Sequence, residues 1–161
     1  MRKLVIAVLT FVASASAAQM VIQAPGPRTV APLGIEAPYQ AVLAAPCTET
    51  EPNEQPSNAS PISVPASCSG NASATDAHGI TINYGNGVSA GVQDLFVFSI
   101  ASSTRVNIAL SWNDTGADID LFLFRPNGSS LEIVTASTTS GSAPESITST
   151  LAPGTYYIGI S

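Results

Sequence analysis

The sequence contains very few basic residues. Lysine and arginine together number five among 161 residues, whereas aspartate and glutamate number eleven. Two of the five, Arg2 and Lys3, stand at the start of the chain, and Lys3 is the only lysine. Nucleic acids and anionic membranes are bound by clusters of lysine and arginine, which this composition does not supply. Nucleic acid is therefore excluded as a partner, and so is attachment to an anionic membrane surface.

Long apolar runs are also missing. Residues 4–12 are apolar but too few to span a bilayer, because a spanning helix needs about 20 residues. They follow the positive pair Arg2 and Lys3 and precede the small residues 14–18, which is the pattern of a secretory signal peptide. We therefore expect residues 1–18 to be a leader, cleaved after Ala18 or one residue earlier, and the mature protein to be secreted or periplasmic in a bacterium. Three arginines then face eleven acidic residues, a net charge near −8.

Histidine and cysteine, the usual zinc ligands, are scarce. His78 is the single histidine and has no cysteine neighbour, so a zinc site is excluded. Cys47 and Cys68 are the only cysteines, and their spacing differs from the C-x-x-C pattern of redox enzymes. Because an exported chain meets an oxidising compartment, we predict that they form a disulfide. A bridge that closes such a loop stabilises a fold by about 3 kcal/mol.

Proline is concentrated between the expected leader and Cys47. Residues 19–46 contain five prolines: Pro25, Pro27, Pro32, Pro38 and Pro46. Prolines at this density stiffen a chain and keep it out of a sheet. We interpret residues 19–46 as a Pro/Ala-rich linker and residues 47–161 as one domain, which is long enough for a single hydrophobic core.

Apolar residues in this domain recur with a period of two, which indicates strands. Two rows share one face each: Phe96, Phe98 and Ile100, and then Val106, Ile108, Leu110 and Trp112. Further strands are expected, between turns rich in Gly, Pro and Asn, at residues 62–66, 79–84, 119–124, 131–136, 146–151 and 156–160. No segment after the leader has a helical pattern. The sequence predicts an all-β, antiparallel sandwich, with Trp112 largely buried between its two sheets.

An acidic segment follows Cys47 directly. Four residues with hard oxygen donors stand within six positions: Glu49, Glu51, Asn53 and Glu54. Carboxylate and amide oxygens are the ligands that Ca²⁺ takes in proteins. Pro52 keeps the segment out of a helix, so the four side chains remain on a short extended stretch. We therefore predict a Ca²⁺ site at this edge of the domain.

Four short motifs follow one another along the domain. They are Glu49-Thr-Glu-Pro-Asn-Glu54, Asp94-Leu-Phe-Val-Phe98, Asp118-Ile-Asp-Leu-Phe-Leu123 and Gly154-Thr-Tyr-Tyr-Ile158. In this order and rough spacing the chain resembles the bacterial pre-peptidase C-terminal domain, and also the related collagen-binding domain of clostridial collagenases. The resemblance implies a jelly-roll β-sandwich that is usually appended to secreted peptidases. In some members the acidic segment binds Ca²⁺, and some members bind an extracellular matrix or polymer.

The resemblance extends the predicted site and also weakens it. Asp94 begins the strand that is expected beside the acidic segment, which makes it a fifth candidate ligand. The family often has another acidic residue shortly before this aspartate, where the chain has Gly91 and Val92. We therefore expect Ca²⁺ to bind weakly, with a dissociation constant of about 10⁻⁴ to 10⁻³ M. The family also usually continues into a closing strand, so the domain at residues 47–161 is expected to lack its last strand.

Two strings are similar to enzyme motifs. Gly87-Val-Ser-Ala-Gly91 fits the nucleophile elbow of serine hydrolases, which needs a helix after it and a histidine downstream, whereas His78 lies upstream. Asp114-Thr-Gly-Ala-Asp118 occurs in aspartic peptidases, which need two such aspartates sharing a proton. We interpret the first string as a loop and the second as a turn. Asp118 and Asp120 share a strand face, and we assign both to structural roles at the rim of the sandwich.

The sequence thus favours a secreted, non-catalytic module that binds an extracellular protein or polymer, or that assists secretion or maturation. One alternative is a fragment of a larger secreted peptidase or other hydrolase whose catalytic domain is absent here. Another is an aspartic peptidase that uses Asp114. Tyr84, Tyr156 and Tyr157 are either exposed on a polymer-binding surface or part of the core.

Overall fold

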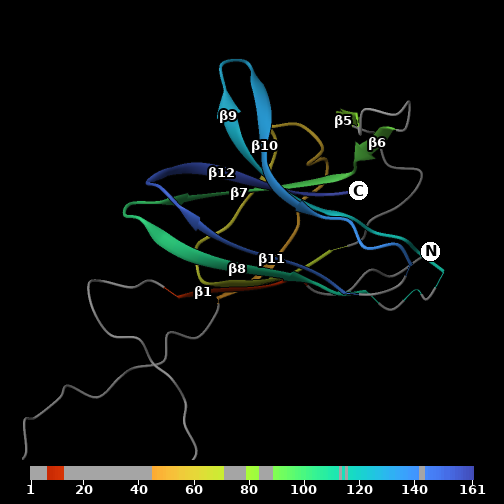
Figure 1. Ribbon diagram of the computed structural model, residues 1–161, viewed down its shortest axis with the longest axis horizontal. Helices are drawn as coiled ribbons and strands as arrows, with labels where there is room; N and C mark the ends of the chain where they lie inside the picture. Colours follow the sequence, from red (N-terminus) through yellow and green to blue (C-terminus); the bar gives the residue numbers. More distant parts are fainter. Residues whose placement is uncertain are drawn as a thin grey trace, which may run out of the picture.

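The computed structural model describes residues 7–12, 45–70, 79–83, 89–112, 114, 116–141 and 144–161 (Figure 1). Within these ranges the chain forms twelve strands and no helix. The all-β class predicted from the two-residue period is therefore confirmed. In the described part of the chain, no helix is long and apolar enough to cross a membrane.

The first of two five-stranded sheets has the order β11-β8-β1-β4-β2. Its strands are β11 (Glu145–Leu151), β8 (Thr104–Leu110), β1 (Ala7–Val12), β4 (Ala66–Ser69) and β2 (Ala45–Thr48). The strand β1 runs antiparallel to both of its neighbours, whereas β2 runs parallel to β4. Part of the expected leader is thus an inner strand of this sheet.

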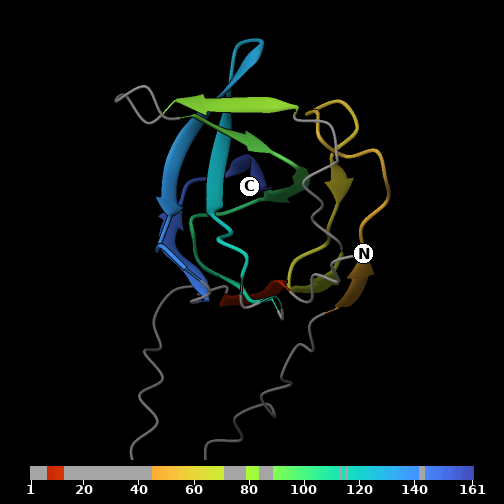
Figure 2. The same ribbon diagram turned by 90° about the vertical axis from the view of Figure 1, so that its right-hand side faces the viewer.

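The second sheet has the order β10-β9-β12-β7-β3. Its strands are β10 (Ser130–Ser137), β9 (Leu121–Asn127), β12 (Gly154–Ile160), β7 (Asp94–Ile100) and β3 (Ser60–Pro61). A separate pair, β5 (Ile80–Asn83) and β6 (Ser89–Val92), completes the described structure. Figures 1 and 2 show the two large sheets as layers, with the hairpin of β9 and β10 projecting beyond them.

The main core lies between the two layers. Along β8, Val106, Ile108 and Leu110 are at most 1% exposed, whereas Arg105 and Ala109, at alternate positions, face solvent. Facing residues from β7, β9, β11 and β12 join the same cluster: Phe96, Phe98, Ile100, Leu121, Leu123, Ile147, Leu151, Tyr156, Ile158 and Ile160. Each such side chain contributes about 1.5–3 kcal/mol when it leaves water. The two-residue period therefore builds the sandwich directly.

A smaller cluster covers the opposite face of the second sheet. It contains Ala59, Val92, Leu95, Phe122 and Phe124, with Ile80 packed against it. The residues of β9 from Leu121 to Phe124 are consequently all buried, because both faces of the sheet are covered. This explains why the sequence there is continuously apolar rather than alternating.

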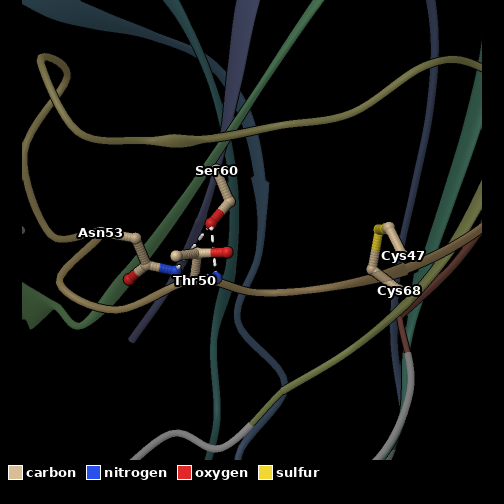
Figure 3. Close-up of a disulfide and its surroundings, with 5 residues drawn as sticks. All are labelled: Cys47, Thr50, Asn53, Ser60 and Cys68. Carbon is tan, nitrogen blue, oxygen red and sulfur yellow. Dashed lines mark hydrogen bonds between the residues drawn. A yellow bond between two sulfur atoms is a disulfide. The ribbon is translucent and has the colours of Figure 1, made fainter.

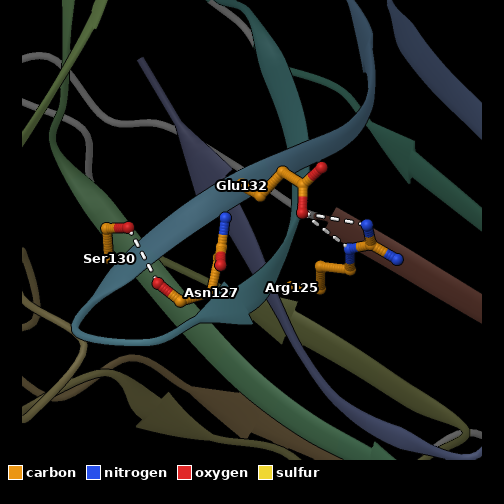
Figure 4. Close-up of polar contacts among 4 residues, drawn as sticks. All are labelled: Arg125, Asn127, Ser130 and Glu132. Carbon is orange, nitrogen blue, oxygen red and sulfur yellow. Dashed lines mark hydrogen bonds and ion pairs between the residues drawn. The ribbon is translucent and has the colours of Figure 1, made fainter.

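The projecting hairpin ends in a tight turn between β9 and β10 (Figure 4). Gly128 has a φ of 62°, a left-handed conformation that glycine adopts without strain. The Ser130 hydroxyl donates a hydrogen bond of 2.9 Å to the Asn127 carbonyl. Arg125 and Glu132 form an exposed ion pair of 2.9 Å across the strands. An exposed ion pair contributes at most about 1 kcal/mol to the free energy of unfolding. The conformation of the turn is therefore the more important determinant of the hairpin.

Two expectations about strands require correction. Residues 62–66 form no continuous strand, because Pro61 and Pro65 flank a stretch that lies between β3 and β4. The string Gly87–Gly91 was expected to be a loop, whereas its residues from Ser89 onward belong to β6. The strand β1 lies within the expected leader, and β2 begins at Ala45, two residues before the expected start of the domain. Residues 13–44 lie outside the described part of the chain.

Trp112 also differs from expectation. It follows β8, which ends at Leu110, and it is partly rather than largely buried. Its ring packs against the rim of the main core, and its indole N–H donates a hydrogen bond of 3.2 Å to the Ala117 carbonyl. The buried row of β8 ends at Leu110, and Trp112 lies two residues beyond it.

The aromatic residues left open by the sequence divide between the core and its surroundings. Tyr156 belongs to the core, where its ring stacks on Phe98 with 5.8 Å between centroids, and its hydroxyl donates to the Ala152 carbonyl. Tyr157 is partly buried against the smaller cluster. Tyr84 lies outside the described residues.

Candidate metal centre

The acidic segment passes from one layer of the sandwich to the other. It begins after β2 in the first sheet and ends at β3 in the second. At its start, the Glu49 amide continues the pairing with β4 by donating to the Ser69 carbonyl at 3.1 Å. Further along, the Leu95 amide of β7 donates to the Asn53 carbonyl at 3.0 Å. Both ends of the segment are therefore held by backbone hydrogen bonds.

Three carboxylates converge where the segment crosses β7. Glu49, Glu51 and Asp94 each offer one carboxylate oxygen, and these oxygens lie within 4.8 Å of one another. Asp94 is fully buried, Glu49 is partly buried and Glu51 is exposed. The group therefore has a buried inner side at β7 and a solvent-facing outer side at Glu51. Residues separated by more than forty positions in the sequence meet here because β7 lies beside the segment.

Asn53 supplies a further buried oxygen in the same segment. Its side chain has no solvent exposure, and its amide nitrogen donates to the Ser60 hydroxyl at 3.4 Å. That hydroxyl also accepts a 3.1 Å hydrogen bond from the Thr50 amide, so Ser60 ties the segment together from inside (Figure 3). The side-chain carbonyl oxygen of Asn53 is buried and accepts no hydrogen bond from the described residues. A buried oxygen in this state costs free energy unless a cation or water binds it.

Glu54 is not a member of the carboxylate group among the described residues. Its backbone packs directly against Gly79, where any side chain would collide with the Glu54 carbonyl. The Gln55 side chain donates a 3.1 Å hydrogen bond to the Gly79 carbonyl beside it. These contacts join the end of the segment to the start of β5.

The disulfide expected from the sequence is present and anchors the other end of the segment. Cys47 of β2 is bonded to Cys68 of β4, with 4.4 Å between their Cα atoms (Figure 3). Glu49 lies two residues beyond the bridge, and its carboxylate packs so closely on Gly70 that a side chain at position 70 would displace it. The bridge and this glycine together restrict where the Glu49 carboxylate can go.

The donor set fits Ca²⁺. Ca²⁺ takes 6–8 oxygen ligands at distances of about 2.3–2.6 Å, so one ion can contact oxygens that lie up to about 5 Å apart. Carboxylates and an amide carbonyl are hard donors, and the group contains no histidine or cysteine. Glu49, Glu51 and Asp94 could hold the ion, with the Asn53 carbonyl oxygen as a further candidate.

The sequence analysis did not identify every residue that shapes the candidate metal centre. Ser60 is 5% exposed and organises the segment, yet a single serine before a proline carries no distinctive signal. Gly70 and Gly79 matter only through close approach, which appears in the fold and not in the spacing. Val92, where the related family often has an acid, is fully buried in the smaller core cluster and supplies no ligand.

The described residues of the strings with enzyme-like patterns lie in a turn and in a strand. Asp114 accepts a 2.9 Å hydrogen bond from the Gly116 amide, and its own carbonyl accepts from Ala117, which makes a turn. Asp118 accepts from the Gly141 amide at 2.8 Å, and Asp120 exchanges two backbone hydrogen bonds with Ser161. Ser89 begins the strand β6, which differs from the strand-to-helix turn of serine hydrolases. His78 lies outside the described residues.

The chain was also compared with known proteins. Residues 92–161 match the family model of the bacterial pre-peptidase C-terminal domain. The family resemblance inferred from the motifs is thereby confirmed, and the matched residues include Asp94 and the strands β7 to β12. No curated protein and no solved structure matches the chain.

The pre-peptidase C-terminal match begins after the acidic segment. The candidate centre therefore joins a residue inside the matched region, Asp94, to residues before it, Glu49 and Glu51. The chain contains a β-sandwich module of a kind typical of secreted peptidases. The disulfide is in keeping with this setting, because disulfides persist in oxidising compartments.

Proposed function

We propose that the protein is a secreted or periplasmic, non-catalytic β-sandwich module that Ca²⁺ stabilises. Its role is to bind an extracellular protein or polymer, or to assist the secretion or maturation of one. The observation that carries the proposal is the convergence of Glu49, Glu51 and Asp94, with their carboxylate oxygens within 4.8 Å of one another. The buried carbonyl oxygen of Asn53 in the same segment supports it.

The ion acts by joining two layers of the fold. Like charges repel at this separation, and a divalent cation converts the repulsion into attraction to a common centre. Glu49 and Glu51 belong to the segment that leaves the first sheet, whereas Asp94 begins β7 in the second. Binding of Ca²⁺ to the native state therefore attaches the segment to the sandwich and adds to its stability by mass action.

The affinity is expected to be low. Three carboxylates and one amide supply fewer charges than a high-affinity centre, and Val92 is directed into the core. Glu51 is exposed, so water completes the coordination on the outer side. We expect a dissociation constant of about 10⁻⁴ to 10⁻³ M, the range of extracellular modules.

Thermal unfolding with Ca²⁺ and with chelator tests the proposal. At a free Ca²⁺ concentration about ten times the dissociation constant, mass action adds about 1.4 kcal/mol to the free energy of unfolding. For a domain of this size the melting temperature should rise by roughly 3–8 °C. Equal concentrations of Mg²⁺ should have a smaller effect, because Mg²⁺ loses its water reluctantly. Identical melting temperatures in Ca²⁺ and chelator would contradict the proposal.

Absence of catalysis is part of the same proposal. Asp114 is held in a turn by its own backbone and side-chain hydrogen bonds. An assay of peptide hydrolysis at acid and neutral pH should give no activity. Activity that is lost in an Asp114→Ala variant would instead support the aspartic peptidase alternative.

A further inference from the structure

The position of β1 in the first sheet points to a second binding site. The strand β1 lies between β8 and β4 and is antiparallel to both. Six of its residues pair with β8, and three of these also pair with β4. The two neighbouring strands make no ladder with each other, so β1 alone joins β11 and β8 to β4 and β2.

The sheet without β1 would contain a gap that is one strand wide. Neighbouring strands lie about 4.8 Å apart, so β8 and β4 are separated by roughly twice that distance. Backbone N–H and C=O groups on the facing edges of β8 and β4 would lose their partners.

The register defines what kind of strand fills the gap. Positions 7, 9 and 11 of β1 pair with Leu110, Ile108 and Val106, which are buried core residues. Positions 8, 10 and 12 pair with Ala109, Asn107 and Arg105, which are exposed or partly exposed. On the other side, positions 7 and 9 pair with the buried residues Cys68 and Ala66. The gap therefore selects an extended strand with apolar residues at alternate positions.

We propose that the gap between β8 and β4 is a strand-acceptor site. In the unprocessed chain Ala7–Val12 fills it, and removal of the leader opens it to an extended segment of a second secreted protein. That segment runs antiparallel to β8 and places apolar residues at three alternate positions, opposite Leu110, Ile108 and Val106. This inference rests on the secretion in the proposed function, with removal of the leader that the sequence predicts, and not on Ca²⁺, so the two can fail independently.

The test uses two chains, residues 1–161 and residues 19–161, and one probe. The probe is a fluorescently labelled peptide of residues 4–14 with lysines added at its C-terminus for solubility. Anisotropy should show saturable binding to the shorter chain and none to the complete chain, in Ca²⁺ and in chelator alike. If the shorter chain folds and does not bind the peptide, the inference is wrong.

The shorter chain itself could fail to fold without an added strand. In that case it is refolded with and without the peptide, and folding is followed by circular dichroism. Recovery of the β-sheet spectrum only with the peptide supports the inference, whereas no recovery with the peptide overturns it. Hydrogen exchange then locates the contact, since amides in residues 104–110 and 66–69 should exchange more slowly with the peptide bound.

Two variant peptides distinguish a registered strand from general apolar adsorption. The first carries Leu9→Asp and Phe11→Asp, at positions that pair with Ile108 and Val106. The second carries Val8→Asp and Thr10→Asp, at positions that pair with Ala109 and Asn107. The first should bind about tenfold or more weakly, because it places charge opposite the core, and the second should bind like the parent. Equal binding of both would overturn the proposed register.

Discussion

Asn53 shows how a single buried side chain can serve both the fold and a ligand. Its amide nitrogen is engaged by Ser60, whereas its carbonyl oxygen is buried and accepts no hydrogen bond from the described residues. A residue that only stabilised the segment would act equally with and without Ca²⁺. A residue that also ligates the ion would contribute more when Ca²⁺ is present.

We therefore predict different Ca²⁺ dependences for two substitutions. Asn53→Ala should lower the free energy of unfolding by about 1–3 kcal/mol in chelator, and by more in Ca²⁺. Ser60→Ala removes the hydroxyl that Thr50 and Asn53 share but leaves the Asn53 carbonyl oxygen, so its effect should be the same in both conditions. Urea unfolding of the two variants measures this. Equal dependence on Ca²⁺ would remove Asn53 from the proposed ligands.

Trp112 and Ile108 give a second prediction at the scale of the residue. The two-residue period places both in one row, yet Ile108 is 1% exposed and Trp112 is only partly buried beyond the strand end. Ile108→Ala should cost about 2–5 kcal/mol, and Trp112→Ala should cost less despite its larger side chain. Urea unfolding of both variants compares the two free energies. A larger loss for Trp112→Ala would mean that the tryptophan is the more deeply packed residue.

At the scale of the element, alternation predicted the strands that have one face in the core. The periods at Phe96 and Val106 correspond to β7 and β8, and the expected strand at 146–151 lies within β11. The pattern is informative in these three strands because one face is buried and the other is wet. The expected strands at 131–136 and 156–160 lie within β10 and β12, although no residue of β10 is buried.

Other elements could not be predicted in this way. The strand β2 contains Pro46 and has little burial, so only its parallel pairing with β4 reveals it. The strand β6 contains Gly91 and belongs to a two-stranded sheet over the smaller cluster. The strand β1 has the composition of a leader, so from the sequence alone it is interpreted as a signal peptide and not as a strand. All three segments are strands because they pair with other strands, and such pairing cannot be inferred from local periodicity.

The disulfide gives a prediction at this scale, because it connects two neighbouring strands. Cys47 and Cys68 join β2 to β4 just before the acidic segment. Replacing both cysteines with alanine should lower the free energy of unfolding by about 2–4 kcal/mol. It should also weaken Ca²⁺ binding, because Glu49 is two residues from the bridge. Unchanged stability in the variant would show that the β2–β4 pairing suffices without the bridge.

At the scale of the whole molecule, the sequence predicted the ingredients of the candidate centre better than its geometry. Glu49, Glu51 and Asp94 do converge, because β7 lies beside the segment that leaves β2. Glu54 has the same chemistry but is not part of the group, and its backbone packs against Gly79. A difference of this kind depends on how distant elements pack, and composition carries no information about it.

The two proposed sites lie in different parts of the module. The acidic segment and Asp94 connect the first sheet to the second, whereas the strand-acceptor site lies within the first sheet. Ca²⁺ would therefore hold the layers together while an added strand completes one of them. Both act on a sandwich whose main core is common to both layers.

Calorimetric titration with Ca²⁺ tests the central claim most directly. The unmodified protein should bind one Ca²⁺ with a dissociation constant of about 10⁻⁴ to 10⁻³ M, and Asp94→Asn should abolish or strongly reduce the heat. Glu132→Gln is the matched control, because it removes one negative charge at the exposed pair with Arg125, on the projecting hairpin. It should bind Ca²⁺ like the unmodified protein. No heat with the unmodified protein, or equal heats with Asp94→Asn and Glu132→Gln, would contradict a Ca²⁺ site at Glu49, Glu51 and Asp94.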